Sequence, residues 1–403
     1  MKKYDIAIIG AGVAGAFAAL KLSENHKDLK SIIFDLGRPP GKRRRQLEGW
    51  FGCFPTGDGK IYTNNSEDLL NLIDGRSLRG ANKWFMNNLS NVDKIKIIKD
   101  KLPTSETQKK ITQQGFELKL NEYIQWNPTQ IHTLSKNISD KIMENPNLTL
   151  SFDNEVWKIY KNKKKEFQIH TSDGDFLAKR IILCVGRSGW RWVNKLYKEL
   201  GIYTNDDFAK FGIMVEMSSN YMKEFNKSHC SIYNKDISVG PLSWNGTVIP
   251  EDHADVAIAS FRSNEERWRT DKVSFLLTGS QYYKDNGCNQ MDRLAKLAFL
   301  LSNDRIGKEK IKTIVKEKSD LSLVPEYSWL PEAINKVSNF IPNILAKGYF
   351  HVPAIFPLIS GLRLGNNLES EIEDLFIAGE SAGLYGVSSA ALTGGLAAEF
   401  ACR

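Results

Sequence analysis

The chain has 403 residues, of which 41% are hydrophobic, 10% aromatic and 25% charged, and its formal net charge is +8. This length predicts two or three domains, and the aromatic content excludes intrinsic disorder as the main state of the chain. The sequence has no apolar run long enough to span a membrane, and its five cysteines form no CxxC pair. We therefore expect a cytoplasmic protein in a reducing compartment, with neither a disulfide framework nor a metal site.

The first forty residues predict a strand, a tight turn, a helix and a second strand. Residues 4–9 form an apolar run of buried-strand type, and residues 10–15 are punctuated by glycine. Helical spacing of small and apolar residues follows, and residues 31–36 form the second strand. This order is a βαβ unit, from which dinucleotide-binding folds are built.

The next stretch predicts a long loop followed by helices and a meander. Residues 35–65 are glycine-rich and basic, residues 66–73 predict a helix with Ser66 as its N-cap, and another amphipathic helix begins at Asn127. Residues 148–178 predict a meander of short strands. Its hairpin tip carries a lysine run that we expect to meet only solvent: Lys158, Lys161, Lys163, Lys164 and Lys165.

The pattern changes in the middle of the chain. A hydrophobic strand over residues 180–185 ends at Gly186, and from about residue 208 alternating strands appear, followed by helices over 292–301 and 308–318. We expect this block to be a second, mixed domain inserted into the first. The predicted domains are 1–205 with 351–403, and 206–350.

The glycines of the first turn form a GxGxxG motif, Gly10-Ala11-Gly12-Val13-Ala14-Gly15. A strand precedes it, a helix follows it, and Asp35 ends the next strand about 20 residues later. Gly12 lets backbone N–H groups approach a pyrophosphate, the helix N-terminus offers free donors to the phosphate, and Asp35 is placed to accept hydrogen bonds from ribose hydroxyls. These three features together predict a dinucleotide site.

A second glycine-rich segment lies at the other end of the chain. Residues 375–380 form a strand that ends in Gly379 and Glu380, and a small-residue helix follows from Val387. The two segments together resemble those with which glutathione-reductase-like flavoproteins hold FAD. The resemblance implies that the acid at Glu380 binds hydroxyls of the ribityl or pyrophosphate side, and that the second helix points its positive N-terminus at the flavin.

A narrower resemblance covers nearly the whole chain. Residues 43–45, 52–60, 127–129, 185–189 and 379–383 occur in the order seen in a group of FAD-dependent dehydrogenases that is distantly similar to geranylgeranyl reductases. It implies a Rossmann-like α/β fold of glutathione-reductase type with an inserted α+β substrate domain. The chain departs from this family at residues 52–56 and 240–246, so the resemblance does not define the substrate.

The residues expected to contact FAD come from both glycine-rich segments and from the stretches between them. They are Gly10, Gly12, Val13, Ala14, Gly15, Asp35, Leu36, Arg44, Gly57, Lys60, Val156, Gly186, Gly379, Glu380, Val387 and Ser388. Cys53 has no second cysteine at disulfide spacing, so we expect a filler or a wall beside the flavin rather than a redox partner.

Candidates for acid–base or substrate-orienting roles are Tyr385, His351 and Arg363, which lie in or just before the C-terminal segment. No second GxGxxG occurs, so NAD(P)H is expected at most as a transiently docking donor, and the electron donor or acceptor stays open.

These features predict an FAD-dependent oxidoreductase in which a hydride moves between a substrate carbon and flavin N5, with a small-molecule substrate bound between the two domains. Two alternatives remain open. The basic surplus also suits a flavoenzyme that modifies a nucleotide or a nucleic-acid base, and a third reading is a flavoprotein that uses FAD structurally.

Overall fold

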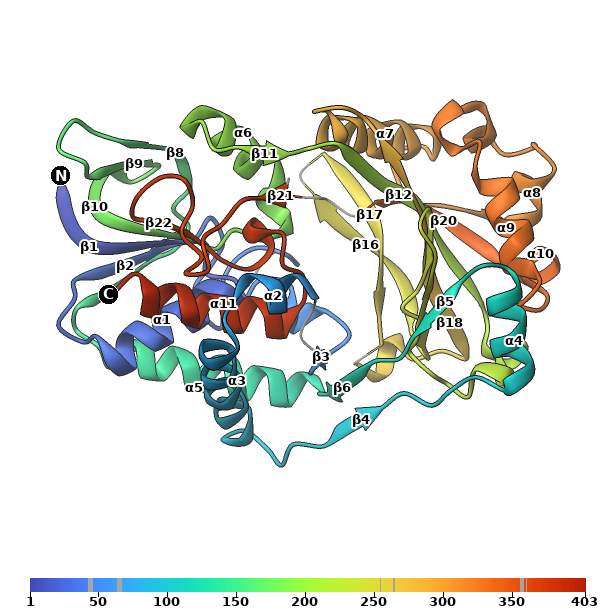
Figure 1. The fold of residues 1–403 in the computed structure, drawn as a ribbon, viewed down its shortest axis with the longest axis horizontal. Coiled ribbons are helices and arrows are strands. Elements are labelled where there is room, and N and C mark those ends of the chain that lie inside the picture. Colours follow the sequence, from blue (N-terminus) through green and yellow to red (C-terminus); the bar gives the residue numbers. More distant parts are fainter. Residues whose placement is uncertain (43–45, 64–66, 254, 264, 356–358, 360) are drawn as a thin grey trace. The chain divides into compact units, whose positions relative to one another are not determined.

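The computed structural model describes residues 1–403 except 43–45, 64–66, 254, 264, 356–358 and 360 (Figure 1). The chain divides into two compact units. The first comprises Met1–Lys96, Ile124–Asn205 and Leu358–Arg403, and the second comprises Ile97–Tyr123 and Asp206–Pro357. The sequence placed residues 97–123 and 351–355 in the first domain, and this is wrong because strands in both stretches pair within the sheet of the second unit.

The first unit is built on a mixed sheet with a parallel core. Its strands are β1 (Lys2–Ile9), β2 (Ser31–Phe34), β7 (Leu148–Ser151), β8 (Val156–Lys161), β9 (Phe167–Thr171), β10 (Gly174–Leu183) and β22 (Leu375–Ile377). The order is β7-β2-β1-β10-β9-β8, and β22 also pairs with β10. Strands β7, β2, β1, β10 and β22 run parallel, as buried apolar strands joined by crossovers do. The predicted mixed α/β fold with a parallel-sheet core is confirmed.

The helices of the first unit are α1 (Val13–Asn25), α2 (Glu67–Leu72), α3 (Gly75–Ser90), α5 (Pro128–Met143), α6 (Trp190–Leu200) and α11 (Val387–Phe400). Helix α5 begins where the sequence predicts, because Asn127 and Gln130 form a reciprocal capping box. The short strands β3 (Lys60–Tyr62), β11 (Thr204–Asn205) and β21 (Gly361–Leu362) complete this unit, and β11 pairs with β21.

Helices α1 and α11 approach each other unusually closely. A Cβ on Gly394 would lie 2.0 Å from the carbonyl oxygen of Ala14, so only glycine fits at this contact. Figure 1 shows the two helices side by side, one from each end of the chain. The small residues of α11 therefore bring the starts of both helices to the same edge of the sheet.

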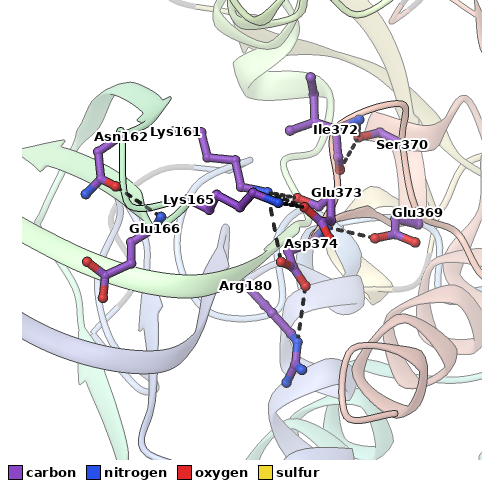
Figure 2. A network of polar contacts seen from close by, with 10 residues as sticks. All are labelled: Lys161, Asn162, Lys165, Glu166, Arg180, Glu369, Ser370, Ile372, Glu373 and Asp374. Atoms are coloured by element: carbon purple, nitrogen blue, oxygen red, sulfur yellow. Dashed lines mark hydrogen bonds and ion pairs between the residues drawn. The ribbon is translucent and has the colours of Figure 1, made fainter.

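The hairpin tip between β8 and β9 does not meet solvent alone. The ammonium group of Lys161 bonds the carbonyl oxygen of Glu373 at 2.6 Å, and both Lys161 and Lys165 lie 3.6 Å from the Glu373 carboxylate (Figure 2). Arg180 pairs with Asp374 at 3.4 Å in the same network. Two of the five lysines, Lys161 and Lys165, thus contact the loop that leads into β22, which corrects the expectation that the whole run meets only solvent.

The second unit is built on an antiparallel sheet in the order β19-β20-β12-β18-β14-β13-β5, with β15 beside β18. Its strands are β5 (Glu117–Lys119), β12 (Phe208–Ser218), β13 (Ser231–Tyr233), β14 (Ile237–Val239), β15 (Ser243–Trp244), β18 (Lys272–Tyr282), β19 (Gly307–Lys310) and β20 (Tyr349–Ile355). A separate hairpin joins β16 (Thr247–His253) to β17 (Val256–Arg262).

The helices of the second unit are α4 (Ser105–Gln113), α7 (Gly287–Leu301), α8 (Ile311–Val315), α9 (Leu330–Ser338) and α10 (Ile344–Lys347), and β4 (Ile97–Lys99) begins it. Strand β6 (Glu122–Gln125) lies where the chain returns to the first unit. Among the described residues, no helix is both long and apolar enough to cross a membrane.

Candidate functional site

A cavity of about 250 Å³ lies within the first unit, at the carboxyl ends of its parallel strands. Its wall comes from the two ends of the chain and from the stretch around residue 186. The described residues that line it are Ile9, Gly10, Gly12, Val13, Ala14, Phe34, Asp35, Leu36, Leu47, Glu48, Gly49, Phe51, Gly52, Cys53, Phe54, Asn154, Glu155, Val156, Cys184, Val185, Gly186, Arg187, Ser188, Gly189, Trp192, Glu380, Gly386, Val387 and Ala390. Crevices at this edge of a parallel sheet are the usual ligand sites of α/β proteins.

The glycines of the first motif serve different purposes. Gly10 adopts a φ of +97°, and a Cβ there would lie 2.8 Å from the carbonyl oxygen of Cys184. A Cβ on Gly15 would lie 1.8 Å from the carbonyl oxygen of Gly10, so Gly15 is required for packing of α1 against the turn. A Cβ on Gly12 would meet only the Cα of Gly52 at 3.9 Å and would otherwise point into the cavity.

Asp35 lines the cavity, but its carboxylate is largely occupied by the protein backbone. It accepts N–H bonds from Ala11 at 2.7 Å, Gly37 at 2.7 Å and Gly49 at 2.9 Å. Burial raises the pKa of Asp35, and these three bonds act in the opposite direction. A carboxylate offers about four acceptor positions, so the one left is enough for a single ligand hydroxyl.

The second glycine-rich segment presents one face to the same cavity. Glu380, Gly386 and Val387 line it, and a Cβ on Gly386 would meet no atom within 4 Å. Gly379 instead packs against α1, because a Cβ there would lie 3.0 Å from the Cβ of Ala14. Helices α1 and α11 therefore both begin at this cavity, through Val13 and Val387.

Arg187 is a cavity residue that sequence reasoning did not identify. Its backbone N–H donates to Oε2 of Glu380 at 2.7 Å, and its Nη2 donates to Oε1 at 3.0 Å. The side chains of Arg187 and Glu380 are 31% and 14% exposed. The two residues are 193 positions apart in the sequence, so no local pattern could have paired them.

Several residues predicted to contact the cofactor are not among the described residues that line the cavity: Gly15, Gly57, Lys60, Gly379 and Ser388. Lys60 is buried, and its ammonium group pairs with Asp58 at 2.7 Å. Arg44 lies outside the described residues. Cys53 does line the cavity, together with the aromatic rings of Phe51 and Phe54, which the sequence had not assigned.

None of the three predicted catalytic candidates is among the described residues of the cavity wall. His351 lies in β20 of the second unit, buried, with its Nε2 3.9 Å from the carboxylate of Glu216. Arg363 follows β21, and its guanidinium stands over the ring of Tyr203 at 5.0 Å. Tyr385 is half-buried between Gly383 and Gly386. Their catalytic roles stay predictions.

Comparison with known proteins gave matches among solved structures only. Neither a protein-family model nor a curated protein matches the sequence. The glycine oxidase of Geobacillus kaustophilus matches 100% of this chain and 95% of its own, with 12% identity and a TM-score of 0.45. The glycine oxidase of Bacillus cereus ATCC 14579 matches 99% of this chain and 94% of its own, with 13% identity and a TM-score of 0.45.

A further match is PqsL, a probable FAD-dependent monooxygenase from Pseudomonas aeruginosa, with 8% identity and a TM-score of 0.39 over 98% of this chain and 84% of its own. The chain is similar to these proteins along most of its length, at low sequence identity. Its function is therefore inferred from the residues of the cavity.

Proposed function

We propose that this protein is an FAD-dependent oxidoreductase. The observation that supports this most strongly is that the starts of α1 and α11 line a single cavity together with Asp35. A helix N-terminus favours negative charge, so two of them on one cavity suit a ligand with anionic or electron-rich groups at two places. FAD is such a ligand, with a pyrophosphate in its middle and a flavin that gains negative charge on reduction.

The residues present fit this cofactor. Because Gly12 has no side chain, it leaves room for a phosphate next to the backbone N–H groups of Val13 and Ala14. These N–H groups belong to the first turn of α1, so the helix itself offers them no acceptor. Asp35 keeps one acceptor position for a ribose hydroxyl, and Val156 begins β8 at the cavity wall. FAD, when bound, would supply the capacity to accept or donate a hydride.

The chain's own contribution would be to bind the cofactor, orient it and exclude water. Phe51 and Phe54 line the cavity and are buried, and Phe51 anchors the loop over the turn by donating its N–H to the carbonyl oxygen of Ala11 at 2.8 Å. Apolar walls of this kind strengthen electrostatic interactions inside a site because they keep the local dielectric constant low.

The first experiment is the absorption spectrum of the purified protein, before and after FAD is added and unbound FAD removed. We expect retained flavin absorption bands. A colourless protein that also fails to quench the fluorescence of added FAD would overturn the proposal.

The substrate class is tested by screening a panel of compounds for anaerobic bleaching of the bound flavin. The panel includes small unsaturated and apolar molecules, NADH and NADPH as transient donors, and nucleosides and oligonucleotides. We expect a small molecule to reduce the flavin or to reoxidise it. Bleaching by dithionite alone would favour a structural flavin, and a response to oligonucleotides alone would favour the nucleic-acid alternative. The expectation that the substrate binds between the two domains stays a prediction.

A further inference from the structure

The segments that follow β10 and β22 are joined by more than strand pairing. Ala378 donates its N–H to Leu183 at 2.9 Å, and Ser381 Oγ donates to the carbonyl oxygen of Val185 at 2.6 Å. The hydroxyl of Tyr197 then donates to the carbonyl oxygen of Ser381 at 2.6 Å. Because these bonds fix the backbone on both sides, the Arg187–Glu380 pair sits on a rigid stretch of the cavity wall.

The charges of this wall are unevenly distributed. Arg187 is the only Lys, Arg or His among the described residues that line the cavity, where the acids are Asp35, Glu48, Glu155 and Glu380. Glu380 is neutralised by Arg187, and Asp35 is held by three backbone N–H groups. The guanidinium thus neutralises Glu380 and supplies the only full positive charge among the described residues of this wall.

We propose that Arg187 binds the diphosphate of the dinucleotide and that Glu380 positions Arg187 for this task. This assignment deepens the proposed function and rests on it. A guanidinium presents its N–H donors in a planar fork, and that fork matches phosphate geometry. The sequence had assigned Glu380 itself to ligand hydroxyls. Two of its acceptor positions are occupied by Arg187, which orients the guanidinium and leaves further positions for ligand hydroxyls.

The N-terminus of α1 alone would hold a diphosphate through partial charges. A full positive charge on the same crevice adds charge-assisted hydrogen bonds, which are roughly twice as strong as neutral ones. The affinity gained from these bonds depends on the phosphate groups of the ligand and not on its base or its sugar. The role of Arg187 can therefore be separated from the general shape of the cavity.

The test compares two competitors that differ only in phosphate. The full-length protein is titrated with FAD by fluorescence quenching, and ADP and adenosine are measured as competitors and by direct calorimetry. In the unaltered protein ADP should compete better than adenosine. In Arg187→Ala the advantage of ADP should fall by about ten- to a hundredfold, the loss expected for charge-assisted bonds to phosphate.

Two variants separate binding from folding. Arg187→Lys keeps the charge without the fork and should retain part of the ADP advantage. Arg191→Ala, one turn along, is the matched control, because its guanidinium stands over the ring of Trp190 at 5.1 Å and Arg191 is not among the described lining residues. It should leave the ratio unchanged. A general folding defect would weaken ADP and adenosine alike, so the ratio is informative even in a destabilised variant.

The outcomes distinguish this inference from the proposed function. If FAD is bound and Arg187→Ala leaves the ratio of ADP to adenosine affinity unchanged, the role of Arg187 is wrong and the cofactor assignment stands. If FAD is not bound but calorimetry shows an ADP preference that Arg187→Ala removes, the cofactor assignment is wrong and the role of Arg187 stands. A chain that binds neither FAD nor ADP overturns both.

Discussion

Gly12 and Gly15 belong to one motif, yet the structure needs them for unrelated reasons. Gly12 has φ −63° and ψ −170°, a conformation that any residue adopts, and its missing side chain leaves cavity space. At Gly15 the missing side chain leaves no space at all, because the carbonyl oxygen of Gly10 fills it. One glycine is thus required by the proposed ligand and the other by the fold.

Substitution by alanine should therefore affect stability at Gly15 and ligand binding at Gly12. Gly15→Ala should lower the free energy of unfolding by about 1–3 kcal/mol, because the turn must shift to admit the methyl group. Gly12→Ala should leave stability within about 0.5 kcal/mol, since nothing in the protein is displaced. It should weaken FAD binding by about tenfold or more, because the methyl group meets the phosphate.

Urea unfolding and FAD fluorescence quenching measure the two effects on the same preparations. Full FAD affinity in Gly12→Ala would show that the phosphate does not approach this turn. Unchanged stability in Gly15→Ala would show that the close contact with Gly10 is not maintained in solution.

At the scale of single residues, sequence reasoning found the parts of the site that depend on local pattern. Gly12, Asp35 and Val387, which strand, turn and helix order predicted as cofactor contacts, line the cavity, and their contact with a cofactor stays a prediction. Sequence reasoning failed where the role of a side chain depends on its interaction partner. Lys60 forms an ion pair with Asp58, and the sequence does not show which acid a given lysine pairs with. Arg187 lies in the segment 185–189 that carries the resemblance, but it was not assigned to the site because the acid that pairs with it is 193 positions away in the sequence.

Among the elements, β12 is tied to its neighbours by a buried carboxylate. Glu216 lies 2.8 Å from the ammonium group of Lys272 in β18 and 2.9 Å from that of Lys308 in β19, and His351 of β20 lies at 3.9 Å. Burial would raise the pKa of Glu216, but the nearby imidazole of His351 and the hydrogen bonds from Lys272 and Lys308 together hold this pKa well below its usual range. One side chain thus links four strands of the sheet.

A lowered pKa makes the stability of the second unit depend on acid. The stabilisation is complete above the ordinary value of 4.5 and is lost as the pH falls below it, because the unfolded chain then binds the proton first. Glu216→Gln should lower the free energy of unfolding by about 2 kcal/mol at neutral pH, and the difference from the unaltered protein should shrink below pH 4.5.

Urea unfolding at a series of pH values from neutral to below 4.5 measures this difference. Glu332→Gln is the control, because Glu332 is exposed and pairs with Lys336 along its own helix, an arrangement that contributes little to stability. A difference for Glu216→Gln that stays constant with pH would contradict the lowered pKa.

The prediction of elements failed where pairing overrides local pattern. The sequence separated residues 176–178 from 180–185, whereas β10 is one strand that pairs with β9 along its first half and with β22 along its second. Residues 148–151 were assigned to the meander, but β7 pairs in parallel with β2. The predicted helix over 308–318 begins as β19, because Lys308–Lys310 pair with β20 before α8 starts at Ile311.

For the molecule as a whole, the cavity brings together three stretches that are far apart in the chain. Turn residues 10–14, residues 184–189 and the C-terminal residues 380–390 all contribute to its wall. A dinucleotide that fills the cavity must therefore contact all three stretches together. The domain scheme predicted from the sequence also assigns residues 1–205 and 351–403 to one domain.

Hydrogen exchange with and without FAD tests this arrangement directly. We expect amide protection to increase in all three stretches, because a bound ligand suppresses the local opening of the segments that it contacts. Adenosine, added in place of FAD, should protect the stretch near Asp35 and Val156 more than the start of α11. Protection limited to the N-terminal turn would show that the ligand does not reach the C-terminal segment.

The position of α11 also affects when the cavity can form during synthesis. Its small residues close against α1, so the second half of the wall exists only after residues 375–400 have been made and have packed onto a helix from the start of the chain. Closing a loop of that length is slow compared with forming local structure. The early βαβ unit therefore emerges with an incomplete cavity wall, and the proposed cofactor can be bound in full only after α11 has packed onto α1.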